Sequence, residues 1–416
     1  MIRRSHAVAI ALACALPRLL VLASERGDIL SSYTEKSDDF ARVLVSSGTF
    51  GLIPGVPSAY TQPLYSFFLV PIYWAERSWW LIGGSQILVA FLAALVVYLI
   101  GLRIGDRRVA LTASLISTLH PYLVWHDIHV NREILDQLLG ALLVLCTLAC
   151  AERPTLRRGL LLGLVTGLAV LGNSRLVLLP LVLGGYLLVV RRREAVIPAA
   201  AILAGVAVAV VPWMVRNETR VGCFTITTDA RALWKANNPA TYETLRRGDW
   251  IDQVPDLPGV APSPQDAADI YNATGRVVRV DECAQMHFYQ REVIDFWRDQ
   301  PIEKAKLAGL AVAGLWSPIV GPASDRSEGS GTWLDTARNW IVPTWFVALL
   351  AFAVAGARRV PRRFLGLAMT LLAYETVMAT VFTGATRYRV SWEFLLALLA
   401  APAVVGLLDR VRGHPR

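Results

Sequence analysis

Two adjacent carboxylates, Asp38 and Asp39, are followed closely by Arg42 in a short amphipathic segment near the N-terminus. A carboxylate can act as a general base toward a hydroxyl or an amine, and a guanidinium can bind an anionic group. On a helix Asp38 and Asp39 point about 100° apart, whereas Asp39 and Arg42 share a face because they are three residues apart. The segment predicts either catalytic carboxylates or a solvated helix start with aspartates at the positive end of the dipole.

Several arginines lie near the ends of apolar runs, where a charge is costly unless it faces a polar cavity or a partner. One such arginine can extend to lipid headgroups, but arginines from several loops at one membrane face favour a shared anionic ligand. Guanidinium groups bind phosphate through two parallel hydrogen bonds and stay charged at any working pH. The predicted phosphate-binding residues are Arg42, Arg132, Arg175, Arg216, Arg387 and Arg389. Arg387 and Arg389 flank Tyr388 in one very short outer loop.

His126, His129 and Glu133 share one helical face at spacings of three and seven residues. Such a set can bind a divalent ion. We favour the alternative, in which they are interfacial polar residues at the end of a helix pair, and we predict no metal ligands. Glu133, Tyr388 and Asn237 are the predicted substrate-binding residues.

The elements that must position these side chains are membrane-spanning helices. Of the 416 residues, 55% are hydrophobic and 18% charged, the mean hydropathy is +0.46, and apolar runs recur along the chain. A soluble protein of this length carries more charge. The net charge of +9 does not indicate nucleic-acid binding, because the arginines gather in short loops between apolar runs. We predict an all-α polytopic membrane protein.

The dense basic clusters lie at 3–4, 103–108, 153–158, 191–193, 358–363 and 410–412. With the N-terminus in the cytoplasm, ten spans place every one of these basic clusters on the cytoplasmic side, as the positive-inside rule requires. Both termini are then cytoplasmic. Residues 305–320 are apolar but short, and counting them as a span would move the cluster at 358–363 outside. We therefore predict an interfacial or re-entrant helix there. The predicted spans cover 7–23, 81–102, 109–125, 133–151, 159–172, 175–190, 195–215, 340–356, 364–383 and 391–408.

This topology divides the chain into three predicted parts. Residues 1–215 form an N-terminal membrane module with a catalytic first outer loop at 24–80, residues 216–320 an extracytoplasmic loop with the interfacial helix, and residues 321–416 the C-terminal membrane helices. Cys223 and Cys283 share the second outer loop. They can pair if this loop faces an oxidising compartment, and otherwise remain free.

Four motifs, taken in order, resemble the GT-C glycosyltransferases that use polyprenyl-phosphate sugars. The group they are most similar to contains the protein O-mannosyltransferases and the lipid A aminoarabinose transferases, glycosyltransferase families 39 and 83. The motifs are Ser37–Arg42, Pro57–Tyr65, Pro212–Asn217 continuing to Trp234–Pro239, and Arg387–Arg389.

The resemblance implies a GT-C-type helix bundle of about ten spans with extracytoplasmic loops. It implies inverting transfer of a sugar from a polyprenyl-phosphate donor to a lipid, glycan or protein acceptor on the outer face, in the bacterial cytoplasmic (inner) membrane. The family's catalytic acid falls on Asp38 and Asp39, with Asp39 favoured because Arg42 follows it at the family's spacing. No cofactor is required, a divalent metal is compatible, and membrane lipids but no nucleic acid are expected partners.

Two other functions are compatible with a multi-span protein. A transporter or flippase predicts broken helices with charges near the bilayer midplane and an inverted repeat, and neither is visible in the sequence. A non-catalytic subunit that binds a lipid phosphate predicts that the arginines matter and the carboxylates do not.

Overall fold

Long apolar helices form most of the structure, a computed structural model that describes residues 3–31, 35–320 and 337–413. Within these ranges, seven segments are long and apolar enough to cross a membrane, and one of them, Ser174–Val221, contains two helices. A multi-pass membrane protein is therefore supported, although length and apolarity alone do not establish ten spans. The long helices of the bundle are α1 (Arg4–Ser24), α4 (Trp79–Ile104), α7 (Glu133–Glu152), α8 (Leu156–Gly172), α9 (Leu179–Arg191), α10 (Val196–Val221), α17 (Val342–Gly356), α18 (Arg362–Val381) and α20 (Glu393–Val411).

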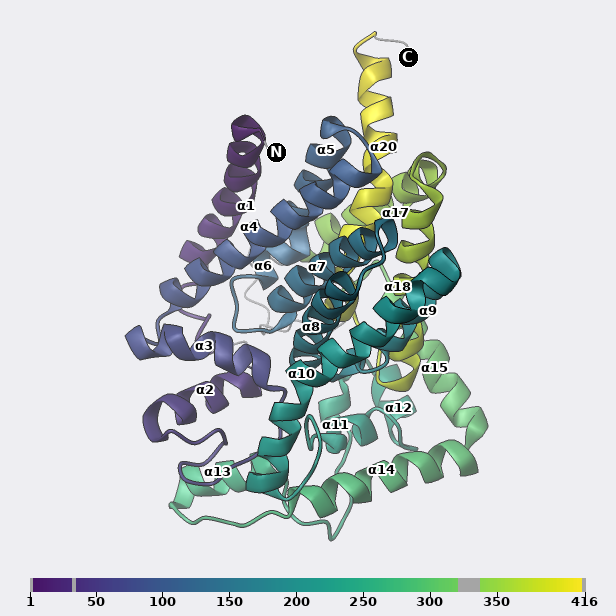
Figure 1. Cartoon of the computed structure of the whole chain (residues 1–416). Helices are drawn as coiled ribbons and strands as arrows, with labels where there is room; N and C mark the ends of the chain where they lie inside the picture. The colour runs from purple at the N-terminus through teal and green to yellow at the C-terminus, as the bar shows by residue number, and fades with distance from the viewer. Residues whose placement is uncertain (1–2, 32–34, 321–336, 414–416) are drawn as a thin grey trace.

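The dense basic clusters meet at one end of the bundle, which is also the end where the two chain termini lie (Figure 1). Arg103 forms an ion pair of 2.8 Å with Glu152, and Arg108 one of 2.6 Å with Asp409. These contacts tie loops far apart in the sequence to the same end. The arrangement at one end of the bundle is compatible with the charge pattern, which predicts the clusters on one side of the membrane.

Small residues let α8 and α10 approach closely. A Cβ atom added at Gly163 would lie 2.3 Å from the carbonyl oxygen of Ile202, and one at Gly205 would lie 2.5 Å from that of Leu160. Close backbone contact through small residues is a common way to hold helices together in lipid, where the hydrophobic effect does not drive their association.

The predicted span at 109–125 is wrong as a single helix. The structure divides it into α5 (Arg107–Thr118) and α6 (Pro121–His126). Pro121 explains the break, because proline has no N–H to donate and disfavours helical geometry in the preceding residue, His120. The nine other predicted runs each overlap one of the helices named above.

A buried ion pair connects α1 to the loop after α6. Arg18, with 1% of its surface exposed, donates to the Asp127 carboxylate at 2.7 Å and to the carbonyl oxygens of Cys14 and Thr118. Our sequence analysis did not single out this arginine, because it sits inside an otherwise apolar run.

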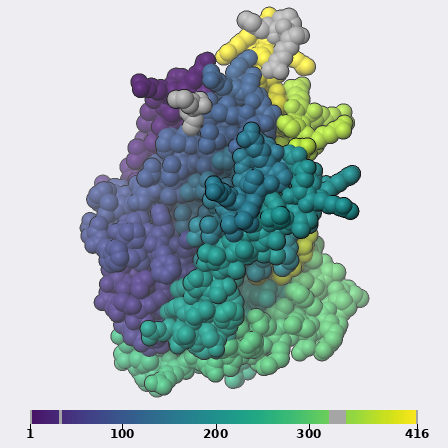
Figure 2. Space-filling model, in the orientation of Figure 1, coloured from purple at the N-terminus to yellow at the C-terminus, as the bar shows by residue number. Residues whose placement is uncertain are grey.

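The polar segments gather at the end of the bundle opposite the termini (Figure 1). In the space-filling view, the segment that follows α10, in green, lies across this end (Figure 2). Helix α15 then continues from α14 and packs against α18. At 16 residues it is not among the segments long enough to cross a membrane. The shorter helices are α2 (Lys36–Ser47), α3 (Pro63–Ala75), α11 (Ala230–Lys235), α12 (Thr241–Arg246), α13 (Pro264–Thr274), α14 (Glu282–Asp299), α15 (Pro301–Trp316) and α19 (Thr386–Val390).

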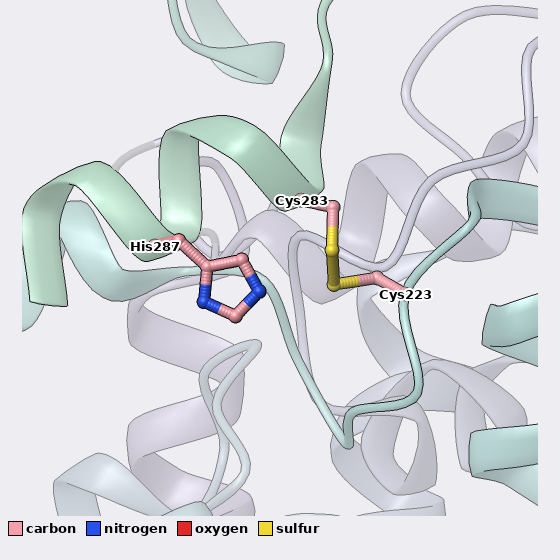
Figure 3. A group of neighbouring side chains, drawn as sticks. All are labelled: Cys223, Cys283 and His287. Atoms are coloured by element: carbon pink, nitrogen blue, oxygen red, sulfur yellow. A yellow bond between two sulfur atoms is a disulfide. The ribbon is translucent and has the colours of Figure 1, made fainter.

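A disulfide joins Cys223, just after α10, to Cys283 at the start of α14 (Figure 3). This confirms the first of the two alternatives for these cysteines. The bridge closes a long segment, with a sequence separation of 60 between the two cysteines, and His287 lies beside it one turn further along α14.

Thiol counting tests the bridge. Under denaturing, non-reducing conditions we expect three labelled cysteines per chain, Cys14, Cys146 and Cys150, and five after reduction. The double variant C223S/C283S should unfold more easily, because in the chain-entropy view closing a segment of this length stabilises the fold by about 4 kcal/mol. Five labels without reductant would contradict the pairing. A reductant should lower the melting temperature of the wild-type protein but not of the double variant.

Candidate functional site

A polar cavity of about 320 Å³ lies where the outer segments meet the ends of the membrane helices. Its walls come from two parts of the chain. The first half supplies the start of α2, the residues before α3 and α7, and the turn between α8 and α9. The second half supplies helix α11, the loop after α12, and the segment from the end of α18 through α19. We call it the polar cavity. Its charged and amide side chains are Glu35, Lys36, Gln62, Arg132, Asn173, Arg175, Asp229, Asp252 and Arg387.

Three of the predicted arginines form one wall of the polar cavity. Arg175 stacks on Tyr388, with its guanidinium carbon 3.5 Å from the ring centroid, and Arg387 lies 4.9 Å from the same ring. Arg132 reaches the cavity from the N-terminal end of α7 and donates to the Gln62 amide oxygen at 2.8 Å. Tyr388 therefore lies next to two cations, but they are Arg175 and Arg387 rather than the flanking pair Arg387 and Arg389 that the loop spacing suggested.

Much of the hydrogen-bonding capacity of Arg175 remains available. The side chain is 8% exposed and makes one hydrogen bond with described residues, from Nη1 to the carbonyl oxygen of Thr383 at 3.1 Å. A guanidinium carries five N–H groups. Its position on the cavity wall therefore suits an anionic ligand with several oxygen atoms.

Glu35 supplies a carboxylate on another wall of the polar cavity. It precedes the first residue of α2, but its side chain makes no capping hydrogen bond to that helix. Burial raises the pKa of Glu35 above its ordinary value of 4.5, and the negative charge of Glu133 adds to this rise, while Arg132 and Arg387 oppose it. A partly buried carboxylate with a raised pKa in a polar cavity is a candidate general base.

The two predicted catalytic aspartates point to different places. Asp38 is buried, accepts a hydrogen bond from the Tyr73 hydroxyl and pairs with Arg77 at 2.8 Å. Asp39 pairs with Arg42 at 2.7 Å and lines a separate hollow between α2 and α13. Burial raises the pKa of Asp39, and Arg42 opposes this rise. Neither aspartate is among the residues that line the polar cavity.

The six predicted arginines therefore divide into two groups. Arg132, Arg175 and Arg387 line the polar cavity, whereas Arg42, Arg216 and Arg389 make other contacts.

Arg389 and Arg216 are held by the protein itself. Arg389 is 2% exposed, pairs with Glu393 and donates to the carbonyl oxygens of Leu315 and Ser317. Glu393 also contacts the imidazole Nε2 of His120 at 2.8 Å. Arg216 donates to the carbonyl oxygens of Phe50 and Ser58, each at 2.8 Å. The flanking arginines Arg387 and Arg389 thus point in different directions from a single turn of helix.

Glu133 lies behind the arginine wall. Its carboxylate is 3.4 Å from Nε of Arg387 and 3.6 Å from Nε2 of His126, whereas His129 faces Glu25 at 3.8 Å. The two histidines and Glu133 therefore do not converge on one point.

Among the described residues, the group of His, Cys, Asp and Glu side chains close enough together to hold a metal is Cys223, Cys283 and His287. Its two thiols are consumed by the disulfide (Figure 3).

Our sequence analysis missed several residues of the polar cavity, including Glu35, Gln62, Asn173 and Asp229. Glu35 had one usable signal, because it is the acid directly before the amphipathic segment of α2. The others are single polar residues in loops that share no motif. Asp229 shows how the tertiary structure recruits them, since it pairs with Lys36 at 2.6 Å across 193 residues.

Comparisons with known proteins show which fold this chain has. Residues 71–215, about a third of the chain, match the model of the dolichyl-phosphate-mannose-protein mannosyltransferase family. A comparison with curated proteins found no match.

The chain is similar in structure to an archaeal oligosaccharyltransferase. The structure of AglB from Archaeoglobus fulgidus with an inhibitory peptide and a dolichol-phosphate aligns with a TM-score of 0.55 at 13% identity, over 98% of this chain and 51% of that one. The same enzyme tethered to an acceptor peptide gives a TM-score of 0.53 at 14% identity, over 99% and 51% of the two chains. This chain thus spans about half the length of the oligosaccharyltransferase.

A weaker likeness is to ArnT from Cupriavidus metallidurans in its apo state, with a TM-score of 0.40 at 15% identity, over 95% of this chain and 76% of that one. The likeness to the oligosaccharyltransferase confirms the predicted GT-C-type fold.

Arg387 and Arg389 give a matched test of the division between arginines that line the polar cavity and arginines that bind other protein groups. Arg389→Ala should lower the melting temperature in detergent strongly, because breaking a buried ion pair costs about 3–5 kcal/mol. Arg387→Ala should lower the melting temperature less, because its contact with Glu133 is longer, at 3.4 Å, and His126 also faces that carboxylate. It should weaken binding of farnesyl phosphate by at least about tenfold, since one charge-assisted hydrogen bond contributes about 1.5–3 kcal/mol. Equal effects of the two variants on both measurements would contradict the division.

Proposed function

We propose that this chain is a membrane glycosyltransferase that transfers a sugar from a polyprenyl-phosphate donor to a lipid, glycan or protein acceptor on the extracytoplasmic face. The observation that carries the proposal is the convergence of Arg132, Arg175, Arg387 and Glu35 on one polar cavity. This cavity lies at the end of the bundle opposite the basic clusters and the termini. The positive-inside rule makes that end extracytoplasmic, with both termini in the cytoplasm of a bacterial cell.

The arginine wall suits the leaving group. When the bond between the anomeric carbon and the phosphate oxygen breaks, negative charge develops on the polyprenyl phosphate. Fixed cations in a site sheltered from water stabilise such charge strongly, because they are already oriented before the reaction. Arg132, Arg175 and Arg387 supply three of them, so the proposed step does not require a metal.

Glu35 suits the acceptor. As a general base it takes the proton from the acceptor hydroxyl or amine while the oxygen or nitrogen forms its bond to the anomeric carbon. Attack opposite the departing phosphate is a single displacement, so the product has inverted configuration. This assignment replaces Asp39 as our favoured base, because the Asp39 carboxylate is paired with Arg42 outside the polar cavity.

The comparisons support the donor class. The matched family is described as using dolichyl-phosphate-mannose, and a solved structure of the oligosaccharyltransferase contains a dolichol-phosphate. A polyprenyl-phosphate sugar carries the same phosphodiester as dolichyl-phosphate-mannose, and the polyprenyl phosphate released by transfer carries the same phosphate monoester as dolichol-phosphate. In this proposal residues 1–215 supply Glu35 and two of the arginines, the outer segment covers the cavity, and residues 321–416 supply Arg387.

Replacing Glu35 tests the base. Glu35→Gln should lower kcat by at least about 100-fold, because a positioned general base typically contributes a factor of about 10²–10⁴. Binding of farnesyl phosphate should persist, since the arginines are intact. Asp38→Asn and Asp39→Asn are compared in the same assay, with the exposed Glu218→Gln as a control. Full activity of Glu35→Gln would exclude this base, and if Asp39→Asn alone were inactive, Asp39 would be restored as the base.

The pH dependence provides a second test of Glu35. A general base works only when deprotonated, so the transfer rate should fall as the pH drops through the pKa of Glu35. Because burial raises that pKa, the loss should occur at a higher pH than the ordinary glutamate value of 4.5. The measurement is kcat/KM against pH, with Glu35→Asp as the comparison. A rate that stays flat down to pH 4.5 would contradict the assignment.

A further inference from the structure

The amide of Asn237 uses its full hydrogen-bonding capacity within the protein. Nδ2 donates to the carbonyl oxygens of Leu233 and Val381, at 2.8 and 2.9 Å. Oδ1 accepts from Nε1 of Trp297 at 2.9 Å and from Nζ of Lys304 at 2.5 Å. A carboxamide offers two donor and two acceptor positions, so none remains for a substrate. Asn237, predicted to bind substrate, is instead a buried junction between segments.

Lys304 binds the same junction from the start of α15. Its ammonium donates to Asn237 and, at 2.6 Å, to the carbonyl oxygen of Thr380 near the end of α18. The same group lies 4.8 Å from the ring centroid of Trp297. A charged lysine at a largely buried position is costly unless it is satisfied in this way. One side chain thus connects α15 to both α11 and α18.

Two further contacts hold α15 against residues 380–389, a segment that we call the strap. Gly384 of the strap packs directly on the α15 backbone, since a Cβ added there would lie 1.7 Å from the carbonyl oxygen of Ala311. Arg389, at the other end of the strap, donates to the carbonyl oxygens of Leu315 and Ser317 at the end of α15. Helix α15 therefore contacts the strap near its start, in its middle and at its end.

The strap carries part of the arginine wall. The carbonyl oxygen of Thr383 accepts the hydrogen bond from Arg175, and Arg387 and Tyr388 follow four and five residues later. Leu233, which accepts from the Asn237 amide, also lines the polar cavity. A displacement of the strap would therefore move Arg387 and Tyr388 and would break the contact that orients Arg175.

We infer that α15 is a brace for the donor-phosphate site, and that Lys304 is a positioning residue that sets where the strap holds Arg387, Tyr388 and Arg175. The inference rests on the proposed function, because it assigns Lys304 a role in binding the donor. The short apolar helix at 301–316 thereby has a purpose that does not depend on crossing the membrane. Lys304 itself does not line the polar cavity and acts only through the strap.

The physical basis is the precision that phosphate binding needs. Several guanidiniums must meet the oxygen atoms of one phosphate together, and a misplacement of about 1 Å in an active site can cost about 100-fold. A side chain outside the cavity can therefore control affinity strongly if it fixes the segment that carries the ligands.

Lys304→Met provides the test, because it keeps an apolar side chain beside Trp297 and removes the charged donor. Lys306→Met is the matched control, since Lys306 lies on the same helix, is about half exposed and, among the residues that the structure describes, pairs with Glu303 and the ring of Tyr242. A second variant, Gly314→Ala, displaces the strap from another point, because its Cβ would lie 2.7 Å from the carbonyl oxygen of Gly384.

The measurements, on the full-length chain in detergent, are the Kd for farnesyl phosphate, the melting temperature, and kcat and KM with the polyprenyl-phosphate donor. Lys304→Met and Gly314→Ala should each raise the Kd and the donor KM by roughly tenfold. Neither should alter the acceptor KM, and Lys306→Met should match the wild type. A purely structural role would instead lower the melting temperature and leave the Kd of the folded fraction unchanged.

The outcomes separate the two proposals. If Arg387→Ala loses farnesyl phosphate binding but Lys304→Met and Gly314→Ala keep the wild-type Kd, the brace is excluded and the proposed function stands. A loss shared by Lys306→Met would also exclude it, because the effect would not be specific to the junction. If the wild-type protein and Arg387→Ala bind farnesyl phosphate equally, the phosphate site itself fails.

Discussion

The structure depends on one constraint, that each guanidinium placed near membrane depth must find acceptors. In an apolar environment an unpaired charge is costly, so such arginines lie against carboxylates, carbonyl oxygens or aromatic rings. Arg18 meets Asp127 and two carbonyls, and Arg389 meets Glu393 and the end of α15. These pairs join helices that are distant in the sequence. Arg175 is different, because its side chain has one protein acceptor within the described part of the chain and stacks on an aromatic ring beside a polar cavity.

This difference separates arginines that hold the fold from arginines available to a ligand. A fully paired guanidinium contributes packing and connectivity, whereas one with remaining N–H groups at a cavity can bind phosphate. The same reasoning applies to amides and amines. Asn237 and Lys304 are saturated by protein groups and so act on the site only through the segments they connect. Counting hydrogen-bond capacity thus assigns roles that residue type alone leaves open.

The outer segments, which have a small hydrophobic cluster of their own, complete the site. The start of α2 brings Glu35, α11 and the following loop bring another wall, and the strap brings Arg387 and Tyr388. The disulfide between Cys223 and Cys283 and the Asn237 junction hold these segments to the bundle. A GT-C-type fold therefore provides the cavity, while the particular side chains provide its charge.

The sequence by itself determined the class of the protein and the helical runs, because hydropathy acts locally along the chain, and its charge pattern predicted on which side of the membrane the basic clusters lie. It also indicated Arg132, Arg175, Arg387 and Tyr388, since arginines at outer helix ends are unusual wherever they occur. Only the tertiary structure decided that Arg389 and Arg216 bind the protein, that Glu35 rather than Asp39 lines the cavity, and that Pro121 divides one predicted span. The physical reason is that a side chain's role depends on which distant carbonyls and carboxylates it meets, and spacing along one segment does not contain that information.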